Sequence, residues 1–121
     1  VEEPSEVLLS TGEAPASEPE TQALIALIEK LTPTRVIAMH APLACIDDPQ
    51  ASPEAVWLGK ETGLPVVKDV GYPTPGSFGT WCGERALPII TYEFPRASVE
   101  QLVIDHLPTL TSILSGAWPF D

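Results

Sequence analysis

The chain alternates between segments with helical periodicity and short runs of strand-forming residues. Residues 17–31, SEPETQALIALIEKL, open with Ser17 as the expected N-cap and Glu20 three residues later, the spacing of a capping box. Apolar residues then recur at intervals of three and four, as on one face of a helix: Leu24, Ile25, Leu27, Ile28 and Leu31. A short connection leads to RVIAMH (35–40), which predicts a buried strand ending at His40.

The same order of helix and strand continues along the chain. SPEAVWLGKETG (52–63) predicts a helix with Ser52 as N-cap, and LPVVKDV (64–70) predicts a strand. TWCGERA (80–86) predicts a short helical piece, and PIITYEF (88–94) predicts the next buried strand.

Two further segments are expected to be loops, and a helix comes last. The loops are APLACIDDPQ (41–50) and the glycine- and proline-rich GYPTPGSFG (71–79). The helix is capped by Ser98 and runs from about Val99 to Leu114. Pro108 inside it predicts a kink or a break.

This alternation predicts an α/β fold with a mixed or parallel sheet flanked by helices. Residues 1–16 are acidic and rich in proline and serine, and we interpret them as an arm or linker before a domain at 17–121. The carboxyl ends of parallel strands meet at one edge of a sheet. We therefore expect His40 and Glu93 to share an edge.

Composition narrows the possible partners and the compartment. The 121 residues include 17 acidic and 6 basic side chains, a net charge of −11 that would repel nucleic acids and anionic membranes. No apolar run is long enough to span a membrane and no secretory leader is visible, so we expect a cytoplasmic protein. Two cysteines, Cys45 and Cys82, fit a reducing compartment, although a single bridge between them stays open. The chain begins at Val1, and we expect an upstream segment to be absent.

Three polar residues have two interpretations each. Glu93 follows a run of apolar strand residues, where a carboxylate loses solvation unless it reaches water or serves a site at the sheet edge. His40 is either a hydrogen-bonded structural residue or a metal-binding or catalytic one. Tyr72 is either a packing aromatic or part of a shaped functional loop.

The order of these residues resembles that of the zinc metallocarboxypeptidase family. Tyr72 lies 32 residues after His40, and Glu93 lies 21 residues after Tyr72. SEPETQALIALIEKLTPTRVIAMH resembles the family's helix and the strand that ends on its third zinc ligand. GYPTPGSFGTW resembles its mobile tyrosine loop, and PIITYEFP resembles the strand with its general-base glutamate. The resemblance covers the chain from about Ser10 to Leu114.

The resemblance implies a role for each of the three residues. His40 would bind the zinc ion (Zn2+), Glu93 would act as general base and then acid, and Tyr72 would donate a hydrogen bond to the substrate. HAPLACIDDP and GYPTPGSFGTWC are most similar to family members that act on murein peptides. This implies a zinc-dependent amidase that hydrolyses the γ-D-glutamyl-meso-diaminopimelate bond of a murein tripeptide or a related peptide.

One part of the family pattern is absent. The family's other zinc ligands come from an upstream His-x-x-Glu motif, but Leu43 and Thr109 stand three residues after His40 and His106. No Asn-Arg pair for a substrate carboxylate occurs either. The chain therefore resembles the C-terminal half of the fold, and we expect it to be inactive without the N-terminal half or a second chain.

Two other functions stay open, as do several residue roles. The chain could be a non-catalytic α/β module that pairs with a partner segment, or a hydrolase that uses Cys45 or Cys82. Asp47 and Asp48 either pair with the side-chain amine of diaminopimelate or simply face water. The remaining expectations are that Ser77 and Phe78 shape the pocket, that His106 is structural and that Trp57, Trp81 and Trp118 pack.

Overall fold

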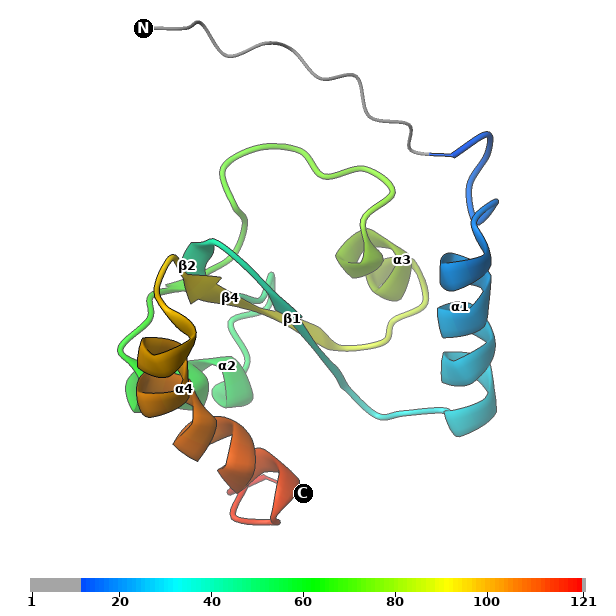
Figure 1. Ribbon diagram of the computed structural model, residues 1–121. Coiled ribbons are helices and arrows are strands. Elements are labelled where there is room, and N and C mark those ends of the chain that lie inside the picture. Colours follow the sequence, from blue (N-terminus) through cyan, green and yellow to red (C-terminus); the bar gives the residue numbers. More distant parts are fainter. Residues whose placement is uncertain (1–11, 121) are drawn as a thin grey trace, which may run out of the picture. The chain divides into compact units, whose positions relative to one another are not determined.

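The computed structural model describes residues 12–120, which fall into two compact units that divide after Pro33. The first unit contains helix α1 (Pro19–Leu31). Most of the expected arm, 1–16, lies outside the described residues. In chain order the second unit contains β1 (Val36–His40), β2 (Leu43–Asp47), α2 (Pro53–Thr62), β3 (Val66–Val67), α3 (Phe78–Glu84), β4 (Ile89–Pro95) and α4 (Val99–Leu114) (Figure 1).

Helix α1 begins one residue later than the sequence indicated. Glu18, with an extended backbone, is the N-cap, and no side chain caps the helix. The prediction of Ser17 as N-cap was therefore wrong. Pro19 determines the start instead, because its fixed φ suits the first helical position and its missing N–H needs no partner there.

The four strands form one mixed sheet in the order β1-β4-β2-β3. Strand β1 pairs in parallel with β4, β4 pairs antiparallel with β2, and β2 pairs in parallel with β3. The predicted α/β class with a mixed sheet and flanking helices is confirmed.

The segment 41–50, expected to be a loop, contains strand β2, so that prediction was wrong. Strand β2 pairs with β4 through Leu43, Cys45 and Asp47, and Asp47 also pairs with β3. These three alternate residues of β2 lie on one side of the sheet. The pairing with β4 holds this segment extended despite the prolines on both sides of it. Strand β3 is shorter than expected, because only Val66 and Val67 pair with β2.

The hydrophobic core lies on the side of the sheet that α2 and α4 cover. Its fully buried members are Ile46, Ala55, Leu58, Ile90 and Tyr92. Strand β1 is an outer strand of the described sheet and pairs on one side only, so it is half-buried to exposed rather than buried as predicted. Met39 in this strand is 59% exposed.

The sequence predicted a kink or a break at Pro108; helix α4 runs through Pro108 without a break, so a kink alone stays a prediction. The helix packs against α2, and its buried residue His106 lies 2.6 Å from the hydroxyl of Tyr92 through Nδ1. This hydrogen bond ties α4 to β4 and confirms the structural role expected for His106. The ring of Trp57 meets that of Trp118 edge-on, as expected for packing residues.

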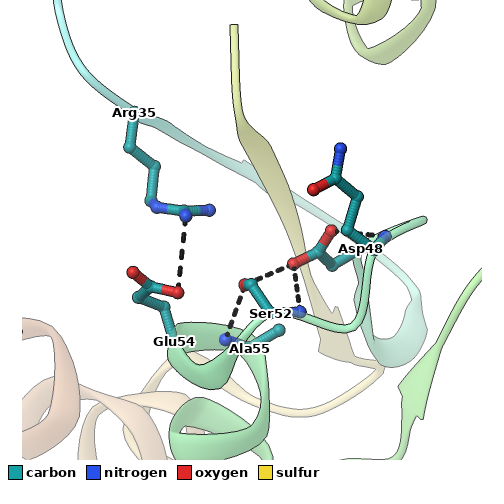
Figure 2. Close-up of polar contacts among 6 residues, drawn as sticks. Arg35, Asp48, Ser52, Glu54 and Ala55 are labelled. Carbon is teal, nitrogen blue, oxygen red and sulfur yellow. Dashed lines mark hydrogen bonds and ion pairs between the residues drawn. The ribbon is translucent and has the colours of Figure 1, made fainter. Parts of the chain in front are cut away.

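A polar network fixes the start of helix α2 (Figure 2). The carboxylate of Asp48 accepts hydrogen bonds from the backbone N–H groups of Gln50 and Ser52 and from the Ser52 hydroxyl. Ser52 Oγ accepts in turn from the N–H of Ala55, which confirms Ser52 as the N-cap. Gly63 ends the helix with a φ of +73°, a left-handed conformation that glycine adopts without strain.

Candidate active site

His40 and Glu93 lie side by side at one edge of the sheet, as the sequence predicted. They are register partners on the parallel strands β1 and β4. Nδ1 of His40 is 3.9 Å from Oε1 of Glu93. The imidazole is 54% exposed, while the Glu93 carboxylate is 8% exposed. A buried carboxylate beside an accessible imidazole is an arrangement suited to proton transfer.

Glu93 lies within strand β4 (Ile89–Pro95) and does not reach into water beyond the strand end. The interpretation of Glu93 as a solvated strand end was therefore wrong. Its other carboxylate oxygen, Oε2, accepts a hydrogen bond of 3.4 Å from the N–H of Leu43 at the start of β2. The carboxylate is thus held between β1 and β2, with few partners to offset its lost solvation.

A hollow of about 740 Å³ opens on the same side of the sheet. Its walls include His40 and Glu93, Tyr72 from the loop before α3, and Phe78 from α3 itself. Tyr72 is 58% exposed, so its ring stands at the surface of this hollow. Ser77, which caps α3 by accepting from the N–H of Thr80, also lines it. All three residues predicted to carry the chemistry therefore border one hollow.

Asp47 and Asp48 have opposite roles despite being neighbours. Asp48 is buried, and its carboxylate is used by the turn before α2. Asp47 lines the hollow, and its Oδ1 is buried without a hydrogen-bond partner among the described residues. Burial raises the pKa of Asp47, and the nearby charges of Asp48, Glu93 and Asp69 raise it further.

Three further residues line the hollow, and of these only Asp47 was named from the sequence, where binding the side-chain amine of diaminopimelate was one of its two interpretations. Asp47, Thr91 and Lys68 all border the hollow. Thr91 lies on β4 two residues before Glu93, and it is the register partner of Asp47. The spacing of two along β4 is a signal in the sequence, but the positions of Asp47 and Lys68 depend on the unexpected strand β2 and its pairing with β3.

Both cysteines are free and buried, so the open question of a Cys45–Cys82 bridge is answered against it. Burial raises the pKa of both thiols, and the charges of Asp47 and Glu93 raise that of Cys45 further. A nucleophilic cysteine needs the opposite shift, because the thiolate is the reactive form. The hydrolase that uses Cys45 or Cys82 therefore has no support in this geometry.

The described residues do not form a metal site by themselves. Within 12–120, no group of three or more His, Cys, Asp or Glu side chains is placed to hold a metal ion. Catalytic zinc is bound by three protein ligands, and His40 offers one accessible imidazole. Any further ligands would have to come from outside the described part of this chain.

Comparison with known proteins shows that the chain is similar to one part of an amidase, a hydrolase. The chain matches the crystal structure of murein-tripeptide amidase from Escherichia coli O157 with a TM-score of 0.87 and 47% identity, over 90% of this chain and 46% of that one. Searched against family models, the chain matches none.

The sequence relatives agree with this result. Murein peptide amidase A of Vibrio campbellii is 50% identical over 109 residues, which are 90% of this chain and 44% of the relative. The protein of the same name from Escherichia coli K12 is 46% identical over 112 residues, which are 93% of this chain and 46% of the relative. The chain is a homologue of murein peptide amidase A and spans slightly less than half the length of these relatives. No helix within 12–120 is long and apolar enough to cross a membrane.

Proposed function

We propose that this chain is part of a zinc-dependent amidase that hydrolyses the γ-D-glutamyl-meso-diaminopimelate bond of murein peptides. The observation that supports this most is the register pairing of His40 with Glu93, 3.9 Å apart, in a homologue of murein peptide amidase A. Such a reaction needs a metal ligand and a base. The accessible imidazole of His40 can serve as the first and the buried carboxylate of Glu93 as the second, and both border one hollow.

Each of the three residues has a role in this proposal. His40 is one ligand of the zinc ion. The ion, when bound, supplies the positive charge that acidifies the attacking water. Glu93 accepts the proton from that water and passes it to the leaving amine nitrogen. Tyr72 donates a hydrogen bond from its hydroxyl to the substrate at the surface of the hollow.

Activity in this proposal requires more than these 121 residues. His40 is the one zinc ligand proposed among the described residues, which contain no group of three side chains placed to hold a metal ion, and the relatives extend over about twice this length. We use the term assembled enzyme for this chain together with the remaining part of a murein peptide amidase, in one polypeptide or as a second chain. The chain alone is then inactive, and the assembled enzyme works in the cytoplasm, where free thiols such as Cys45 and Cys82 persist.

The test is release of free meso-diaminopimelate from L-alanyl-γ-D-glutamyl-meso-diaminopimelate, measured by mass spectrometry. The assembled enzyme releases it, a zinc chelator stops the release, and His40→Ala removes bound zinc as measured by elemental analysis. Met39→Ala is the matched control, because Met39 is the neighbouring residue in β1 and points to the other side of the sheet. A zinc-free protein that releases no diaminopimelate would instead support the non-catalytic module.

A further inference from the structure

One residue of strand β2 has a left-handed backbone, beside the residue proposed as the base. Ala44 has a φ of +52°, a conformation that residues with a Cβ atom rarely adopt. The pairing of β2 with β4 runs from Leu43 to Asp47 and omits Ala44. Such an unfavourable backbone persists only where the surrounding structure holds it, and it is a feature of functional sites. The contacts on either side of Ala44 connect it to Glu93.

Both neighbours of Ala44 contact or pair with Glu93. The next residue, Cys45, is the register partner of Glu93. The preceding residue, Leu43, donates its backbone N–H to Oε2 of Glu93 over 3.4 Å. Among the described residues this N–H is the only hydrogen-bond donor to the Glu93 carboxylate, whose other oxygen lies 3.9 Å from Nδ1 of His40. The direction of the carboxylate therefore depends on where the N–H of Leu43 points.

The φ torsion of Ala44 sets that direction. It rotates the part of the chain that carries Leu43 relative to the part that Cys45 holds opposite Glu93. An extended residue has a φ of about −140°, so the observed value of +52° turns Leu43 by about half a turn relative to Cys45. Ala44 itself does not line the hollow. Any effect of Ala44 on the reaction must therefore pass through Glu93 and not through contact with a substrate.

We propose that Ala44 is a positioning residue for the base, Glu93. Its left-handed backbone directs the N–H of Leu43 toward Glu93, and the resulting hydrogen bond holds the carboxylate beside His40 at the hollow. This inference rests on the proposed function, which makes Glu93 the base. A carboxylate that rotates freely is less often placed to accept the proton. The value of kcat therefore depends on the backbone of Ala44, whereas KM does not.

The test replaces Ala44 with two polar side chains of similar size that differ in their tolerance of a positive φ. Asparagine adopts this conformation, whereas threonine is branched at Cβ and does not. In the assembled enzyme, Ala44→Thr lowers kcat about 10- to 100-fold at unchanged KM, and the conservative variant Ala44→Asn retains kcat.

Ala51 offers a matched control for the backbone conformation. It is half-buried like Ala44, has a φ of +45° and lies outside the hollow. Ala51→Thr therefore lowers the urea midpoint and leaves kcat of the folded enzyme unchanged. A loss of kcat in folded Ala44→Asn equal to that in Ala44→Thr overturns the inference, because the loss then does not follow tolerance of a positive φ.

Hydrogen exchange of the Leu43 amide, measured by NMR on the assembled enzyme with labelled leucine, separates this inference from the proposed function. Exchange that is slow in the unaltered enzyme and in Ala44→Asn but about 10-fold faster or more in Ala44→Thr supports the inference. If no peptide is hydrolysed at the same time, only the proposed function fails. Equal exchange in all three proteins overturns the inference and leaves the proposed function standing.

A change in the backbone of Leu43 keeps the test decisive if Ala44→Thr does not fold. Replacing the Leu43 amide by an ester in a semisynthetic chain removes the N–H donor and leaves every side chain in place. The ester should lower kcat of the assembled enzyme about 10-fold or more. An unchanged kcat would show that the hydrogen bond from Leu43 does not position Glu93, and would overturn the inference.

Discussion

The two sides of the sheet differ in chemistry although the same strands build them. One side borders the hollow and carries His40, Asp47, Thr91 and Glu93, while the other side carries the fully buried residues Ile46, Ile90 and Tyr92. Strand β4 contributes to both sides in alternation, because successive side chains of a strand point in opposite directions. Residues that pack in the core therefore alternate along β4 with residues that line the hollow. Substitutions at neighbouring positions should then affect either the free energy of unfolding or the activity.

The largest expected effect on stability is that of Ile90→Ala. Ile90 is fully buried in the core cluster, so its truncation leaves a cavity and lowers the free energy of unfolding by about 2–5 kcal/mol. Urea unfolding of the assembled enzyme measures this. Thr91→Ala is the matched control on the other side of β4 and should be much less destabilising, since Thr91 is half-buried at the hollow. Equal losses for the two variants would contradict the division between the sides.

Tyr92→Phe should have the next largest effect. It removes the hydroxyl 2.6 Å from Nδ1 of His106 and leaves that buried nitrogen without its partner. The expected decrease in the free energy of unfolding is about 1–3 kcal/mol. Activity per folded molecule should be unchanged, because Tyr92 points away from the hollow. A large loss of kcat in folded Tyr92→Phe would show that the two sides are coupled.

Tyr92 should also make the free energy of unfolding depend on pH, in a direction that its raised pKa determines. Burial raises the pKa of Tyr92 from 10.0 to about 12. Between these values the folded chain keeps the proton that the unfolded chain loses, so the free energy of unfolding falls as the pH rises. The contribution reaches about 1.4 kcal/mol per pH unit and disappears in Tyr92→Phe. Tyr72→Phe, on the exposed loop, should leave the slope in place; a slope unaltered by Tyr92→Phe would contradict the assignment.

The smallest expected effect, and one of opposite sign, is that of Asp47→Asn on stability. The pKa of Asp47 is raised, so its ionised form destabilises the fold at neutral pH. The amide should increase the free energy of unfolding by up to about 1 kcal/mol. This gain should shrink as the pH falls through the raised pKa and vanish once the carboxyl is protonated in both states. Thermal unfolding at several pH values measures it.

Asp48→Asn is the matched comparison for Asp47→Asn. The Asp48 carboxylate accepts hydrogen bonds from Gln50 and Ser52, so the same substitution there should destabilise the turn before α2. Two neighbouring aspartates would thus respond in opposite directions. Destabilisation by both substitutions would mean that the Asp47 carboxylate has a favourable partner.

The sequence was sufficient for the features that depend on local patterns. Alternating apolar residues predicted β4, the capping serine predicted the start of α2, and parallel strand ends predicted that His40 and Glu93 share an edge. Strand β2 was missed because the prolines on both sides of it, Pro42 and Pro49, and the aspartate pair at its end are typical of loops. Its extended conformation depends on pairing with β4, a tertiary interaction that local sequence does not reveal.

The missed strand also limited what could be predicted about the candidate site. Without β2, the sequence does not separate Asp47 from Asp48, since both follow an apolar run and precede Pro49. The register of β2 places Asp47 beside Val67 of β3 and opposite Thr91 of β4. The shared position of His40 and Glu93 was therefore predictable, whereas the different surroundings of Asp47 and Asp48 were not.

The most direct test of the account is the turnover of the assembled enzyme with Glu93→Gln. Glutamine keeps the shape of the side chain and can still accept from the N–H of Leu43, so the urea midpoint should not change. Without a base, kcat for the murein tripeptide should fall by about 10²–10⁴-fold, while Glu61→Gln on α2 has no effect. An unchanged kcat in folded Glu93→Gln would contradict the claim that this edge of the sheet carries the reaction.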